Sequence, residues 1–224
     1  MDALEYDFSS MVIDKEEDKV PNEEAPKERS FLKVSFFVGI VYFMLALIEG
    51  TVDLLPVIGE HEDKLIVGNW YAVIKIAVII TYAVFMWGFY RISLLYPNTL
   101  VMLSSIFLVA VTTLTLAGDV YSFYTDDISF LSIQVFKAIL LGAFYVTLGI
   151  GLWRYQSQFG SLALVAGVLG IISGVAFLTV IFALPGLIVF TVFEVFQLVL
   201  LFKVYKYKAN EKQDWQSKDL PVFG

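Results

Sequence analysis

Five charged residues stand inside long apolar stretches of the sequence, where charge is rare. They are Glu49, Lys75, Asp119, Lys137 and Glu194. A charged side chain near the centre of a membrane helix costs on the order of 3 kcal/mol, so such residues commonly pair with one another or mark a substrate or ion pathway. Each of the five falls in the predicted outer third of a membrane span. Two cations and three anions at one depth favour pairing, because an unpaired buried ion is far more costly than a partnered one.

Glu194 has the most apolar surroundings of the five. Phe190, Phe193 and Phe196 are close to it in the sequence, and Gln197 follows one helical turn later on the same face. A carboxylate there is expected to be neutral unless a lysine of the group reaches it. For the other four charges two interpretations remain open: helix-to-helix contacts with lysine stems extended to the interface, or a polar substrate or ion site.

Small residues repeat along the fifth apolar stretch at spacings that share one helix face. They are Ala163, Gly167, Gly170 and Gly174, and the last two form a Gly-x-x-x-Gly pair. Such a face lets another helix approach closely. We expect a partner within the chain, since Gly142 and Gly149 offer a comparable stripe in the fourth stretch; homodimerisation is the alternative.

Enzyme and cofactor signatures are missing from the sequence. There is no cysteine, and the single histidine, His61, is flanked by Glu60, Glu62 and Asp63 in a segment more typical of a solvated loop than of a metal site. No phosphate-binding loop, dinucleotide fingerprint or haem-pairing histidines occur. The net charge of -7 argues against nucleic-acid binding. The sequence therefore predicts a non-enzymatic protein without metal or cofactor.

The elements that must position these residues are transmembrane helices. The 224 residues are 58% hydrophobic and 17% charged, which is too apolar for an ordinary water-soluble domain. A helix needs about 20 apolar residues to cross the hydrocarbon. The sequence predicts an all-α membrane bundle of six transmembrane helices near 31–55, 68–91, 98–124, 130–154, 160–183 and 186–206, with a tight turn at Leu184-Pro185-Gly186.

The distribution of basic residues predicts the orientation. With the N-terminus inside, 12 of the 15 lysines and arginines lie on the cytoplasmic side, as the positive-inside rule requires. Residues 1–30 hold ten acidic and four basic residues and are predicted to be a disordered cytoplasmic tail. Residues 31–206 form the membrane domain, and 207–224 a short cytoplasmic C-terminal tail. We expect a plasma-membrane protein with both termini in the cytoplasm.

Three functions remain open on this basis. The first is a packing or interaction protein in the lipid bilayer, with a homo-oligomer or another membrane protein as partner. The second is a small-solute transport or ligand-binding subunit with an unidentified small-molecule ligand, bound in an outward-opening polar pocket around Glu194, Lys75 and Lys137 in the outer third of the bilayer. The third, least favoured, is an intramembrane enzyme. In size and span count the layout is similar to the substrate-binding subunits of energy-coupling-factor vitamin transporters. Their Ala-x-x-x-Ala motif is missing, since Tyr42 precedes Ala46 and Gly50 follows it.

Overall fold

The computed structural model describes residues 24–52, 64–125 and 130–218, and these residues fold into α-helices without a strand. The helices are α1 (Glu24–Val52), α3 (Lys64–Leu95), α4 (Thr99–Thr125), α5 (Phe130–Arg154), α6 (Gln156–Phe159), α7 (Ser161–Leu178) and α8 (Ala183–Lys218). Six of the described helices, all except α6, are long and apolar enough to cross a membrane. The predicted all-α bundle of six spans is confirmed.

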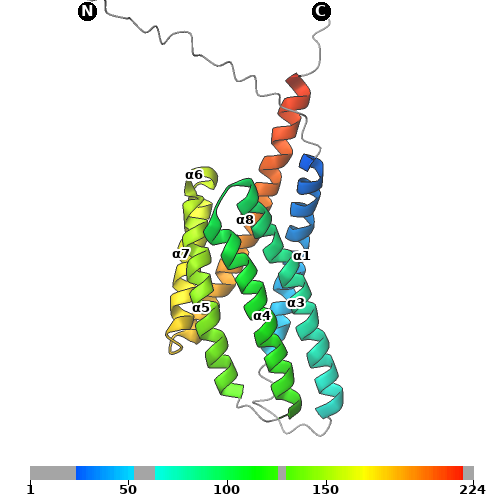
Figure 1. Cartoon of the computed structure of the whole chain (residues 1–224), viewed down its shortest axis with the longest axis vertical. Coiled ribbons are helices and arrows are strands. Elements are labelled where there is room, and N and C mark those ends of the chain that lie inside the picture. Colours follow the sequence, from blue (N-terminus) through cyan, green and yellow to red (C-terminus); the bar gives the residue numbers. More distant parts are fainter. Residues whose placement is uncertain (1–23, 53–63, 126–129, 219–224) are drawn as a thin grey trace, which may run out of the picture.

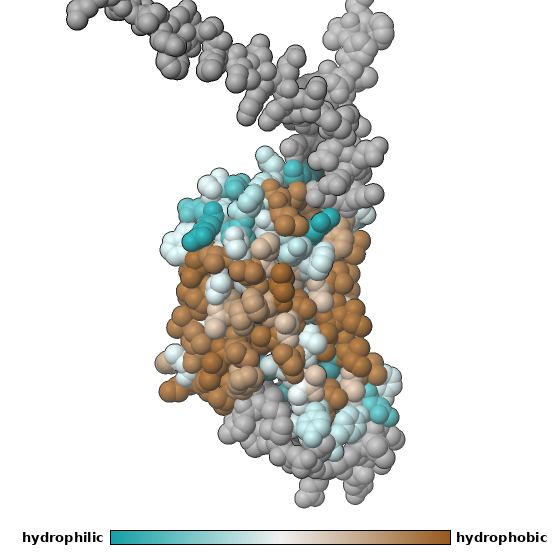
Figure 2. Space-filling view, viewed as in Figure 1, coloured by the Kyte–Doolittle hydropathy of each residue, from teal (hydrophilic) through white to brown (hydrophobic). Residues whose placement is uncertain are grey.

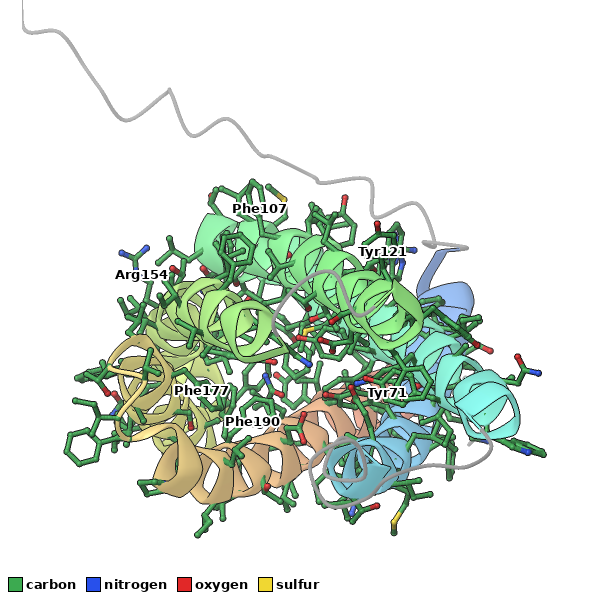
Figure 3. All side chains as sticks on the ribbon, turned by 90° about the horizontal axis from the view of Figure 1, so that it is seen from below. Tyr71, Phe107, Tyr121, Arg154, Phe177 and Phe190 are labelled. Carbon is green, nitrogen blue, oxygen red and sulfur yellow. The ribbon has the colours of Figure 1, made fainter. Side chains whose placement is uncertain are left out.

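The six long helices form a closed ring (Figures 1 and 3). Each spanning helix packs against the next along the chain, and α1 packs against α8 to close the ring. The most extensive contact joins α5 and α7, which the short helix α6 connects. The start of α1 and the end of α8 lie at the same end of the bundle (Figure 1). We call this the terminal end, and the other the opposite end.

A broad apolar band covers the side of the bundle, between more polar ends (Figure 2). Large apolar side chains on every spanning helix are exposed on the outside, among them Val41, Ile80, Leu114, Ile139, Val168 and Ile188. An exposed apolar surface of this extent is unfavourable in water and suits contact with lipid chains. The chain is therefore an integral membrane protein.

The turn between α7 and α8 differs from the prediction. The sequence predicts a break at Leu184-Pro185-Gly186, but α7 already ends at Leu178 and α8 starts at Ala183. Pro185 belongs to the first turn of α8, where its missing N–H costs no helical hydrogen bond. The reversal occurs at residues 179–182, and Val180 adopts a positive φ of 56°. A β-branched residue rarely takes this conformation, which is why the sequence does not indicate the turn.

Both terminal helices extend past the predicted spans at the terminal end. α1 starts at Glu24, so the last residues of the predicted disordered tail are helical, with Pro26 in the first turn. α8 continues to Lys218, beyond the predicted span end at residue 206. Glutamate, lysine, alanine and glutamine predominate in these extensions and are good helix formers that need no membrane contact.

The small residues of α7 lie against α5. Ala163, Gly167, Gly170 and Gly174 are buried in this contact or beside it. A Cβ atom at Gly174 would lie 2.6 Å from the carbonyl oxygen of Gly142, and one at Gly149 would lie 2.7 Å from that of Gly167. The two backbones thus approach as closely as glycine allows. This face of α7 is covered within the chain.

Candidate functional site

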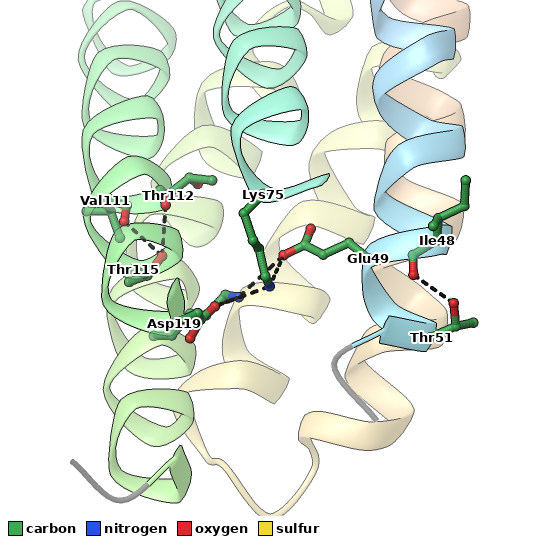
Figure 4. Close-up of polar contacts among 9 residues, drawn as sticks. Ile48, Glu49, Thr51, Lys75, Val111, Thr112, Thr115 and Asp119 are labelled. Carbon is green, nitrogen blue, oxygen red and sulfur yellow. Dashed lines mark hydrogen bonds and ion pairs between the residues drawn. The ribbon is translucent and has the colours of Figure 1, made fainter. Parts of the chain in front are cut away.

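Four of the five intramembrane charges meet near the opposite end of the bundle. The Lys75 Nζ lies 2.6 Å from the Glu49 Oε1 and 3.4 Å from the Asp119 Oδ2. The Lys137 Nζ lies 3.2 Å from the same Asp119 oxygen and 4.0 Å from the Glu49 Oε1. Figure 4 shows Lys75 between Glu49 and Asp119. We refer to these four residues as the four-charge cluster.

The cluster takes one residue from each of the first four spanning helices. Glu49 lies near the end of α1, Lys75 in the first half of α3, Asp119 late in α4 and Lys137 early in α5. Because consecutive helices run in opposite directions, these positions share one depth. The side chains of Asp119 and Lys75 are fully buried, whereas those of Glu49 and Lys137 are 13% and 18% exposed.

The charges in the cluster balance. Two ammonium groups face two carboxylates, and every residue of the cluster contacts at least one partner of opposite sign. The Lys75 Nζ also lies 5.1 Å from the centre of the Tyr71 ring, where the π face attracts a cation. Pairing of this kind offsets the large cost of removing the ions from water.

Glu194 does not belong to the cluster. Its Oε1 accepts a hydrogen bond of 2.6 Å from the Tyr42 hydroxyl, and the residue is buried. Tyr42 lies seven residues before Glu49 on α1, about 10 Å along the helix axis at 1.5 Å per residue. Glu194 is thus about two turns deeper in the bundle than the four other charges.

This depth differs from the sequence-based expectation that all five charges share one level. The reason is the shortness of α7, which has 18 residues against 27 in α4. The turn between α7 and α8 consequently lies nearer the terminal end than do the starts of α3 and α5 (Figure 1). A residue one third of the way along α8 therefore reaches the middle of the bundle.

Aromatic rings surround Glu194 from several helices. We call Tyr42, Tyr82, Tyr145, Phe190 and Phe193 the aromatic wall. The Tyr42 and Tyr82 rings are 4.9 Å apart, the Tyr82 and Tyr145 hydroxyls are 3.2 Å apart, and the Tyr145 ring lies 4.8 Å from Phe190 and 6.0 Å from Phe193. Phe190 points into the ring of helices in Figure 3. These contacts join α1, α3, α5 and α8 around the carboxyl group.

Gln197 is the second buried polar residue on this face of α8. It is fully buried, and within the described residues neither its side-chain nitrogen nor its side-chain oxygen has a hydrogen-bond partner. Leaving a buried amide unsatisfied costs about 1–3 kcal/mol per group. Gln197 is three residues from Glu194, so the two side chains project from neighbouring positions of one face. We call Glu194, Gln197 and Tyr42 the Glu194 site.

The three tyrosines were not predicted to belong to a site. Tyr42, Tyr82 and Tyr145 lie in the middle of spans, whereas tyrosine normally gathers at the membrane interfaces where its hydroxyl is hydrated. A mid-span tyrosine therefore needs a polar partner inside the protein. The mid-span position of these tyrosines was thus a feature of the sequence that could have indicated a buried polar site.

The hydroxyl groups along α4 and the acidic segment around His61 are two further polar features of the sequence. The hydroxyls of Ser104, Ser105, Thr113 and Thr115 on α4 donate to carbonyl oxygens of their own helix. Such bonds are the common behaviour of serine and threonine in membrane helices. The acidic segment around His61 lies outside the described residues, and among the described residues no group of three potential metal ligands occurs.

Comparison of the chain with protein-family models, with curated proteins and with solved structures finds no match. The arrangement of side chains inside the bundle is thus the basis for a functional interpretation.

Proposed function

We propose that this multi-pass membrane protein is non-enzymatic and binds a small solute at the Glu194 site, as a transport or ligand-binding subunit. The observation that carries the proposal is a carboxyl group in the middle of the bundle that no cation of the described residues neutralises. Its hydrogen-bond donor is the neutral Tyr42 hydroxyl. The unpartnered Gln197 amide lies one turn away on the same helix face.

The charge balance of the interior supports this proposal. The four-charge cluster contains two positive and two negative groups, which contact one another. Glu194 is the third carboxyl group, and in its ionised form the five deep residues carry a net charge of -1. An unpaired carboxylate in a dry interior is strongly unfavourable, and a protein retains one chiefly where it has a use.

The basic residues at the terminal end support an orientation with cytoplasmic termini. In that orientation the four-charge cluster lies toward the outside, and the Glu194 site lies near the middle of the membrane. Solute sites of secondary transporters are commonly found at this depth.

A packing or interaction role is the second candidate, and the four-charge cluster favours it. Each charge in the cluster joins neighbouring helices and leaves no excess charge for a ligand, as expected of contacts that hold a bundle together. This candidate gives no account of the unpartnered Gln197 amide.

A thermal-shift screen tests the proposal. Purified full-length protein in detergent is screened against salts, amines, amino acids and carboxylates, in parallel with Glu194→Gln. A ligand of the native state raises the unfolding temperature, so we expect at least one compound to stabilise the wild type and not the variant. Ser105→Ala is the matched control, because its buried hydroxyl donates to a carbonyl oxygen of its own helix.

The two candidates predict different results. If the Glu194 site binds a solute, Glu194→Gln without ligand is at least as stable as the wild type and loses the response. If Glu194 instead holds helices together, no compound stabilises the wild type and the variant simply unfolds at a lower temperature. That second result would overturn the proposal.

A further inference from the structure

We propose that the solute bound at the Glu194 site is a small protonated amine that also carries a hydrogen-bond acceptor, as a short amino alcohol does. This inference rests on the proposed function and specifies its ligand class. It follows from three features of the described residues: a buried carboxyl group without a cationic partner, an unpartnered amide and an aromatic wall.

The charge of the solute follows from the balance of the interior. The cluster is neutral, and the ionised form of Glu194 adds one negative charge at the site, which a bound cation stabilises. One positive charge restores neutrality. A dication would leave an excess positive charge, and an anion would double the imbalance.

The hydrogen-bonding groups of the solute follow from Gln197. Its amide offers a carbonyl oxygen that accepts and an NH₂ group that donates, and both are unpartnered among the described residues. An ammonium N–H satisfies the carbonyl oxygen while another N–H bonds to the Glu194 carboxylate. The NH₂ group then requires an acceptor, which a hydroxyl oxygen on the same solute provides.

Competing monocations satisfy the site less well. A sodium ion can bind the Glu194 carboxylate and the Gln197 oxygen but leaves the Gln197 NH₂ group without an acceptor. A proton on Glu194 removes the charge and likewise leaves that NH₂ group unsatisfied. A quaternary ammonium has no N–H for the Gln197 oxygen.

The aromatic wall favours a cation of small size. Ring faces attract ammonium groups, with about 2 kcal/mol or more available where the site is dry. Tyr82, Phe85 and Phe193 are fully buried close to the site, and a Cβ atom at Gly39 on α1 would meet the Phe85 ring at 2.5 Å. A solute at this site must therefore fit among closely packed rings.

A matched set of five probes tests the inference. Full-length protein in detergent at neutral pH is titrated with ethanolamine, propylamine, choline, 1-propanol and sodium chloride, and affinities are obtained from the shift in unfolding temperature. Propylamine lacks the acceptor, choline lacks the N–H donors and 1-propanol lacks the charge. Potassium chloride at equal ionic strength is the common reference.

We expect ethanolamine to bind best. At about tenfold excess over its Kd it should raise the unfolding temperature by about 3–5 °C. Propylamine should bind about tenfold more weakly, since it leaves the Gln197 NH₂ group unsatisfied. Choline, 1-propanol and sodium chloride should give no saturable shift.

Two variants connect the response to the residues. Glu194→Gln should weaken ethanolamine binding about 30-fold or more, since it removes the partner of a buried charge. Gln197→Leu should keep amine binding but abolish the preference for ethanolamine over propylamine. Gln197→Met serves the same purpose should the leucine variant not be recovered, and Ser105→Ala should behave as wild type.

Other outcomes separate this inference from the proposed function. Saturable binding of sodium or choline that depends on Glu194, without ethanolamine binding, overturns the amine class and leaves solute binding in place. If none of the probes binds, the amine class is wrong, and the broader thermal-shift screen then decides whether any solute binds. Ethanolamine binding that is unchanged in Glu194→Gln would place the amine elsewhere and overturn the inference.

Discussion

The four-charge cluster and the Glu194 site are two buried polar regions in one bundle, and they differ in whether their charged and polar groups have partners within the protein. In the cluster, Lys75 contacts two carboxylates at 2.6 and 3.4 Å, and Lys137 contacts the same two at 4.0 and 3.2 Å. At the Glu194 site, one neutral hydroxyl faces the carboxylate, and the Gln197 amide has no partner among the described residues. Burying charged groups in the membrane is unfavourable in both regions. In the cluster the opposite charges of the protein neutralise one another, whereas at the Glu194 site a bound solute can supply the missing partner.

The sharpest way to break this comparison is to remove the central cation of the cluster. Lys75→Met leaves the carboxylates of Glu49 and Asp119 facing Lys137, which is the more exposed of the two lysines. We expect a loss of about 3–5 kcal/mol in the free energy of unfolding, because uncompensated buried charge remains. Unfolding in mixed micelles measures the change. Lys206→Met, at an exposed position of α8, is the control; equal stability of the two variants would contradict a structural role for the cluster.

Both regions depend on the position of α5, which supplies Lys137 to the four-charge cluster and Tyr145 to the aromatic wall around Glu194. A Cβ atom at Gly149 would lie 2.7 Å from backbone atoms of Gly167 and Ile171. Gly149→Ala should therefore push α5 and α7 apart and cost about 1–3 kcal/mol. Gly118→Ala is the matched control, since a Cβ atom there would meet nothing within 4 Å and alanine gains up to about 1 kcal/mol in a helix. If Gly149→Ala unfolds at the same temperature as the wild type, the close approach of α5 and α7 at Gly149 is refuted.

At the Glu194 site, in the absence of ligand, we expect a substitution to increase the free energy of unfolding rather than to lower it. Glu194→Gln keeps the shape and an oxygen for the Tyr42 donor, but it removes the unneutralised charge. We expect a gain of about 1–2 kcal/mol, as is common where function rather than stability maintains a residue. The melting temperature without added solute measures it. A clear loss of stability would mean that Glu194 serves the bundle as the cluster does.

The smallest effect is expected at the edge of the cluster. Lys137 is 18% exposed, and its partner Asp119 keeps a contact with Lys75 at 3.4 Å. Lys137→Gln should therefore cost only about 0.5–1 kcal/mol, close to the value of a partly hydrated ion pair. The losses in free energy of unfolding for Lys137→Gln and Lys75→Met are measured under one condition. Their ratio shows how strongly the burial of each lysine determines its contribution to stability. Equal losses would mean that exposure has no such effect.

The spans, the residues of the cluster and the shared face of Glu194 and Gln197 were predictable from the sequence, whereas the depth of Glu194 and its contact with Tyr42 were not. Apolar length determines a span, and charges at similar distances from alternating ends share a depth. This places Glu49, Lys75, Asp119 and Lys137 at one level without specifying which of them are in contact. The same reasoning failed for Glu194, because the left-handed Val180 ends the α7 hairpin early. Tyr42 is a partner of Glu194 across 152 residues, and no local pattern indicates so distant a contact.

The closure of the ring by α1 and α8 has a consequence for biogenesis. All residues of the four-charge cluster lie in α1, α3, α4 and α5, so the cluster can assemble once the fourth spanning helix has entered the membrane. The Glu194 site instead joins the first spanning helix to the last. The ribosome must therefore complete α8 before the site can form. Until then the Tyr42 side chain contacts lipid or an insertion factor. Nascent chains stalled before α8 would be folded around the cluster but have no Glu194 site.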